Sequence, residues 1–80
     1  MDYDGLTAGY SWAWNVLVVQ GATGDRVREI QCLLNYHGKV LPVDGDFGPQ
    51  TFNKVWEFQA ARGITRDGKV GPSTWRQLRK

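Results

Sequence analysis

Apolar side chains recur at helical spacing in three stretches of the chain. The first stretch runs from Asp25 to His37, the second from Pro49 to Arg62 and the third from Pro72 to Arg79. The apolar positions within them are Val27, Ile30, Leu33 and Leu34, then Val55 and Phe58, then Trp75 and Leu78. This spacing gives each helix one apolar face that can be buried against its neighbours. The pattern therefore predicts three helices around one core.

The residues before the first helix have a different pattern. Trp14 and Val16 alternate with smaller or polar residues, which favours an extended chain over a helix. We expect a strap that crosses the domain and buries Trp14 and Leu17. Residues 1–13 are interpreted as a tail or linker and residues 14–80 as the domain.

Small and polar residues mark the predicted helix ends. Gly38 and Gly63 follow the first two helices, and a glycine commonly stands where a helix stops. Thr23 or Asp25 is expected to cap the start of the first helix through its side chain.

One nine-residue pattern occurs twice, as Asp44–Phe52 and as Asp67–Trp75. Both copies read Asp-Gly, any residue, an apolar residue, Gly-Pro, any residue, Thr and an aromatic residue. Asp-Gly favours a tight turn, Pro suits the first position of a helix, and Thr can bond backbone groups of the first turn. We call these copies the first and second motif. Because the same motif occurs twice in one small domain, we interpret it as a structural element and not as a functional site.

The repeat includes side chains outside the motifs. Gln31 and Gln59 recur with it, and we predict that both are buried amides bonded to loop backbone. Asp44 and Asp67 are predicted to be the acceptors that form the turns. The predicted core positions of the motifs are Phe47, Phe52, Val70 and Trp75. The expected fold is an all-α, compact three-helix bundle with a pseudo-symmetric helix–loop repeat.

Composition narrows the possible functions. Eighty residues allow one small domain, and a net charge of +2 argues against a nucleic-acid or membrane surface. The single Cys32 excludes an internal disulfide and is predicted to be a buried small hydrophobe. The apolar run at residues 12–19 is too short to span a bilayer, and no targeting segment is evident after Met1.

The acidic and nucleophilic side chains do not form a recognisable reactive site. A calcium loop that began at Asp44 would need Gly at its sixth position and Glu at its twelfth, which are Pro49 and Val55 here. Cys32 and His37 alone cannot supply a zinc cluster, and His37 is interpreted as a solvated surface residue. We expect no catalytic residues, no metal and no cofactor.

The spaced residues of the chain resemble the peptidoglycan-binding type 1 domain over about residues 14–79. The positions that carry the resemblance are Gly24, Val27, Ile30, Gln31, Leu34, Gly38, Val43 to Gly45, Phe47 to Pro49, Thr51, Val55, Phe58, Gln59, Gly63, Asp67, Gly68, Val70 to Pro72, Thr74, Trp75 and Leu78. The resemblance implies a three-helix fold and a non-catalytic module that targets a bacterial or phage hydrolase to the cell wall. Such hydrolases are amidases, carboxypeptidases or muramidases. Trp56 departs from the pattern, because that helix position is usually polar.

A peptidoglycan ligand offers sugar faces, amides and peptide carboxylates. Exposed aromatic, amide and basic side chains suit these groups, and the candidates are Tyr36, Gln50, Asn53, Trp56 and Arg62. Trp56 has an alternative interpretation, in which it packs against the strap or the first helix. The expected setting is extracellular or cell-wall-associated, with a monomer that binds peptidoglycan and serves a hydrolase catalytic domain.

Two other functions compete with wall binding. One is a protein-interaction or prodomain-like module that docks on a catalytic domain. The other is a three-helix DNA binder, which would need a basic recognition face. The third helix has Arg76, Arg79 and Lys80 only at its end, so the DNA-binding hypothesis is disfavoured.

Overall fold

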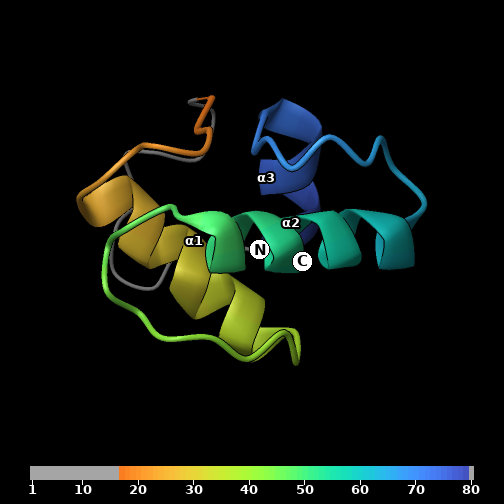
Figure 1. The fold of residues 1–80 in the computed structure, drawn as a ribbon. Coiled ribbons are helices and arrows are strands. Elements are labelled where there is room, and N and C mark those ends of the chain that lie inside the picture. The colour runs from red at the N-terminus through yellow and green to blue at the C-terminus, as the bar shows by residue number, and fades with distance from the viewer. Residues whose placement is uncertain (1–16, 80) are drawn as a thin grey trace.

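Three helices make up the regular structure of residues 17–79, the part of the chain that the computed structural model describes. They are α1 (Asp25–Tyr36), α2 (Pro49–Arg62) and α3 (Pro72–Leu78). Figure 1 shows α2 crossing α1, with α3 above them and long loops between the helices. The predicted all-α three-helix fold is confirmed. The predicted ends of α1 and α3 lie one residue too late, and the predictions for residues 1–13 and Trp14 fall outside the described residues.

The start of α1 is fixed by a loop contact and not by a side-chain cap. Gly24 is the N-cap at φ 103°, without a side-chain hydrogen bond, so the prediction that Thr23 or Asp25 caps this helix is wrong. The N–H of Gly24 donates to the carbonyl of Gly45 at 2.9 Å. A glycine adopts this positive φ without strain, so the backbone can both enter the helix and bond the first motif.

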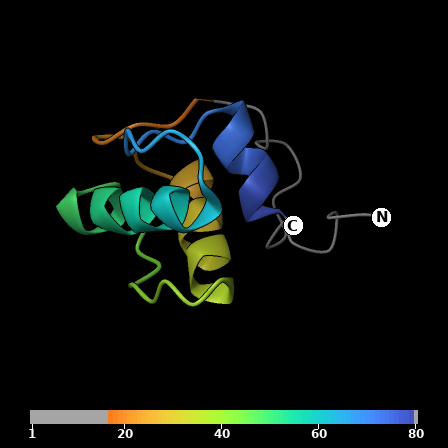
Figure 2. The same cartoon turned by 90° about the vertical axis from the view of Figure 1, so that its right-hand side faces the viewer.

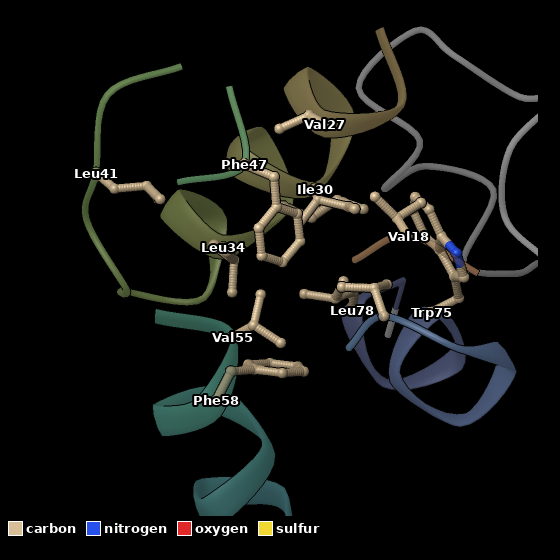
Figure 3. Packing of buried hydrophobic residues seen from close by; sticks show 12 residues of the cluster. Val18, Val27, Ile30, Leu34, Leu41, Phe47, Val55, Phe58, Trp75 and Leu78 are labelled. Carbon is tan, nitrogen blue, oxygen red and sulfur yellow. The ribbon is translucent and has the colours of Figure 1, made fainter. Parts of the chain in front are cut away.

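The core lies where the three helices meet, and Figure 3 shows its side chains pointing toward one another. The predicted core residues Phe47, Val70 and Trp75 are all buried. Phe52 is only half-buried, and it packs against the edge of this core with its ring over Gly68 of the second motif. Cys32 is also half-buried, so the prediction of a fully buried thiol is wrong.

An extended segment at residues 17–24 joins the two motifs, and we call it the strap. Val18 pairs with Val70 in an antiparallel bridge, with N–H to carbonyl distances of 3.0 and 2.8 Å. Further along, the N–H of Gly21 donates to the carbonyl of Phe47 at 2.9 Å. Figure 2 shows the strap running beside the loop that precedes α3.

The side chain that the strap buries is Val18 and not Leu17. Val18 is 2% exposed and Leu17 is 62% exposed, so the predicted burial of Leu17 is wrong. Neighbouring residues of an extended chain point to opposite sides, and the pairing with Val70 turns Val18 inward. Leu17 is left on the surface beside the second motif.

An ion pair is buried between α1 and the residue that follows α3. Glu29 and Arg79 are 0% and 1% exposed, and their side chains contact each other. The guanidinium of Arg79 also lies 4.7 Å from the ring centre of Trp75. Burial raises the pKa of Glu29 to about 7, while the charge of Arg79 and its hydrogen bond act to lower it.

This ion pair gives the first prediction, a fall in stability between about pH 4.5 and 7. Because the pKa of Glu29 is higher in the folded protein, the folded state keeps a proton that the unfolded chain has lost in this range. The contribution of Glu29 is fully present below about pH 4.5 and declines as the pH rises to about 7. Urea unfolding at a series of pH values measures it. The variant Glu29→Gln cannot titrate there and should show a flatter profile; parallel profiles would contradict the prediction.

Candidate functional site

Each motif is built around one buried glutamine amide. In the first motif, Gln31 Nε2 donates to Asp44 Oδ1 at 2.9 Å, to the carbonyl of Asp46 at 3.2 Å and to Thr51 Oγ1 at 3.1 Å. Its Oε1 accepts from the N–H of Gly45 at 2.9 Å. The amide therefore fixes the turn from inside, as the sequence predicts.

The second motif repeats this arrangement around Gln59. Its Nε2 donates to Asp67 Oδ1, to the carbonyl of Lys69 and to Thr74 Oγ1, at 3.1, 2.8 and 3.0 Å. Its Oε1 accepts from the N–H groups of Asp67 and Gly68 at 3.1 and 2.9 Å. The prediction that both glutamines are buried amides bonded to loop backbone is confirmed.

The two aspartates have the predicted role of turn acceptors. Asp44 Oδ1 accepts from the N–H of Asp46 at 3.0 Å, and Asp67 Oδ1 accepts from the N–H of Lys69 at 2.9 Å. The hydrogen bond from Asp46, with that from Gln31, lowers the pKa of Asp44 below its ordinary value. The carboxylates at the start of each motif therefore belong to the scaffold.

A surface hollow lies on each motif, and the same six motif positions line both. The first hollow holds about 160 Å³ and the second about 470 Å³. Gln31 and Pro42 complete the lining of the first, while Leu17, Gly63, Ile64 and Thr65 extend the second. We call the second hollow the groove. The strap residue Leu17 forms part of its wall, with Cδ1 near Gly71.

The two hollows differ in charge at equivalent positions. Lys69 lines the groove where Asp46 lines the first hollow, and Ser73 stands where the first hollow has Gln50. The groove is larger and carries a cation, while the first hollow has carboxylates at both Asp44 and Asp46. Sequence reasoning missed the groove residues. The sequence feature that could have identified the groove residues is the set of positions at which the two motifs differ.

The five predicted site residues do not lie on one surface. Gln50 lines the first hollow, and Asn53 and Trp56 are exposed on α2. Arg62 is nine residues from Asn53, which is about two and a half helical turns, so it points to the opposite side of α2. The predicted grouping of the α2 residues on one side of the helix is therefore wrong for Arg62.

Arg62 belongs to a cluster where the ends of the three helices meet. Its Nη2 donates to His37 Nδ1 at 2.9 Å, and its Nη1 lies 3.4 Å from Gln77 Oε1. His37 Nε2 lies 2.7 Å from the carbonyl of Leu78, and Tyr36 packs edge-on against the His37 ring at 5.1 Å. His37 is half-buried, so the prediction of a solvated histidine is wrong, because these contacts hold it between helices.

Trp56 remains accessible to a ligand. It is 41% exposed, and the guanidinium of Arg66 lies 5.5 Å from its ring centre. The guanidinium covers one face of the indole in a cation–π interaction. Trp56 and Asn53 thus present an aromatic and an amide on the outer side of α2.

Residues 17–79 contain neither a cluster of metal-ligating side chains nor a membrane-spanning helix. No three His, Cys, Asp or Glu side chains within that range come together as metal ligands would. None of the helices in this range has the length and apolar content needed to cross a membrane.

The fold and its paired glutamine-centred motifs define a class of small three-helix modules. The family described as "Putative peptidoglycan binding domain" matches residues 23–78, and the chain belongs to this family. The match begins at the end of the strap and includes both motifs and all three helices.

The chain is similar to other proteins over most of its length. A protein from Kitasatospora aureofaciens, described as an uncharacterized protein in the bpoA1 3' region, is 43% identical over 75 residues, which are 91% of this chain and 63% of that protein. The zinc D-Ala-D-Ala carboxypeptidase of Streptomyces albus G is 34% identical over 70 residues, covering 84% of this chain and 28% of the enzyme. The crystal structure of the SleB N-terminal domain superposes with a TM-score of 0.76 at 37% identity, covering 80% of this chain and 89% of that one. The chain thus spans less than two thirds of the length of either relative matched by sequence.

Proposed function

We propose that this chain is a non-catalytic module that binds bacterial cell-wall peptidoglycan and brings a cell-wall hydrolase to its substrate. Membership of the peptidoglycan-binding family carries this proposal. The groove adds a physical basis, since an open hollow of about 470 Å³ along the second motif is a surface that a ligand can fill.

The partners follow from the same family. The carboxypeptidase relative matches this chain over only 28% of its length, which supports a module that works beside a larger catalytic domain. We place the protein in an extracellular or cell-wall setting, as a monomer, with peptidoglycan as its ligand. Tyr36, Gln50, Asn53, Trp56 and Arg62 remain candidate ligand residues, with Trp56 and Asn53 as candidate sugar contacts.

Co-sedimentation with purified, insoluble peptidoglycan tests the proposal. We expect the folded chain to sediment with the wall in a saturable manner and to remain bound when salt is raised to about 0.3 M, where charges farther apart than a Debye length are largely screened. An unrelated domain of similar size and net charge is the control. Sedimentation no greater than that of the control would reject the proposal. Capture by a hydrolase catalytic domain without wall binding would favour a prodomain-like module instead.

A further inference from the structure

We propose that the groove binds the stem peptide of peptidoglycan, with Lys69 binding one of its carboxylates. This inference rests on the proposed function and specifies the part of peptidoglycan that the groove binds. Stem peptides carry free carboxylates, amides and small methyl side chains, whereas the glycan strand offers sugar rings.

The lining of the groove suits a peptide better than a sugar. Its apolar surface comes from the aliphatic groups of Leu17, Ile64 and Pro72, and its hydroxyls include Thr65 and Ser73. Within residues 17–79, no aromatic side chain lines it, although the C–H face of a sugar ring is best covered by an aromatic ring. Aliphatic walls with hydroxyl groups match alanine methyls and the peptide amides between them.

The groove carries a cation, Lys69, beside the single carboxylate of Asp67. The Asp67 carboxylate already accepts hydrogen bonds from Gln59 and from the N–H of Lys69. The Lys69 side chain is exposed, and no ion pair joins its ammonium to another residue between 17 and 79. A carboxylate that enters the groove can therefore bind this ammonium through a charge-assisted hydrogen bond.

The first hollow serves as an internal comparison. It has the same scaffold, but Asp46 stands at the position of Lys69, and its volume is about a third as large. The first hollow is lined by two carboxylates and no cation, which disfavours an anionic peptide, whereas the groove pairs one carboxylate with the Lys69 ammonium. The two motifs thus share a framework, and only the second offers both the room and the charge for a stem peptide.

The decisive experiment pairs a change in the protein with a change in the ligand. The full chain is titrated by NMR or calorimetry with a free stem tetrapeptide and with the same peptide whose carboxylates are converted to carboxamides. We expect the replacement Lys69→Ala to weaken binding of the free peptide roughly tenfold, since each tenfold is about 1.4 kcal/mol, and to change amide-peptide binding little. Lys39→Ala removes the same charge outside the groove and is the matched control, while Lys69→Asp copies the first motif and should weaken binding further.

Parallel titrations separate this inference from the proposed function. The groove assignment would be overturned if peptide-free glycan strands bind, stem peptide does not, and Trp56→Ala abolishes the glycan binding. This outcome would leave wall binding intact. Peptide binding that is equal in the parent chain and in Lys69→Ala would overturn the role of Lys69. Binding to insoluble wall with no peptide binding at millimolar concentration would also overturn the inference. Failure to bind the insoluble wall itself would reject the proposed function.

Discussion

Replacing Gly68 by alanine is expected to destabilise the domain severely, and replacing Gly63 should cost far less. Both glycines have nearly the same conformation, at φ 72° and 71°. An alanine held in this left-handed region costs about 1 kcal/mol, and this penalty should be similar at the two sites. Their surroundings differ, because a Cβ on Gly63 meets nothing within 4 Å, whereas one on Gly68 overlaps the ring carbons Cδ2, Cε2 and Cζ of Phe52.

The overlap at Gly68 adds an overpacking penalty to the strain. Overpacking a site that cannot relax costs about 1–3 kcal/mol, so Gly68→Ala should lose about 3 kcal/mol in total. For a domain of this size, each kcal/mol shifts the melting temperature by about 4–8 °C. Calorimetry should therefore show a fall of roughly 15 °C for Gly68→Ala and of roughly 5 °C for Gly63→Ala.

Two further variants test the cause of this difference. In Gly45→Ala, the new Cβ lies 3.0 Å from Cζ of Arg28, an exposed and flexible side chain that can move away, so the loss should stay near that of Gly63→Ala. Adding Phe52→Leu to Gly68→Ala removes the ring carbons that clash and should recover part of the loss. Equal melting temperatures for Gly63→Ala and Gly68→Ala would show that the contact with Phe52 is not limiting.

The repeated part of the fold could be predicted because each motif contains the residues that shape it. Asp-Gly, Gly-Pro and a glutamine at matching positions in two copies define the turn, the helix start and the buried amide. The structure confirms these roles for Gln31 and Gln59. Local rules were sufficient because most partners of each motif lie within about 20 residues along the chain.

The strap register could not be predicted because the alternation at Trp14 and Val16 does not continue into residues 17–19. Residues 16–19 are all apolar, so a shift of one residue gives an equally good pattern while exchanging the buried and exposed sides. The bridge between Val18 and Val70 decides the register. The partial burial of His37 could not be predicted from local sequence either, because the carbonyl that it contacts belongs to Leu78, 41 positions away.

The candidate site was harder to predict because a scaffold repeats and a binding surface need not. The identical positions of the motifs are those that form the turns, while Lys69 and Ser73 differ from their counterparts in the first motif, which are Asp46 and Gln50. The position of Arg62 could have been predicted from its spacing in the sequence. It lies four residues after Phe58, which places both on the same face of α2 and excludes Arg62 from the outer side. Its guanidinium does lie 4.9 Å from the ring centre of Phe58.

Replacing Gln59 by methionine is expected to be about as damaging as any single change in the domain. Methionine keeps the length of the side chain and removes its amide, leaving the N–H groups of Asp67 and Gly68 and the carbonyl of Lys69 without this partner. Each buried polar group left unpaired costs about 1–3 kcal/mol, so the total should be about 4 kcal/mol. Domains of this kind are stable by only about 5–15 kcal/mol, and urea unfolding should show the loss directly. Gln50→Met, at an exposed position, is the matched control and should change stability by less than about 0.5 kcal/mol.

A second substitution at this position shows whether the donor or the acceptor of the amide matters more. In Gln59→Glu the new carboxylate can still accept from the N–H groups of Asp67 and Gly68, but it faces the Asp67 carboxylate that now accepts from the amide. At neutral pH two anions would meet in a buried site, which is strongly unfavourable. Protonation of the new carboxyl restores a donor to Asp67, so this variant should regain stability relative to Gln59→Met as the pH falls from about 7 to 5. A constant difference between the two variants over that range would show that the donor to Asp67 contributes little to the second motif.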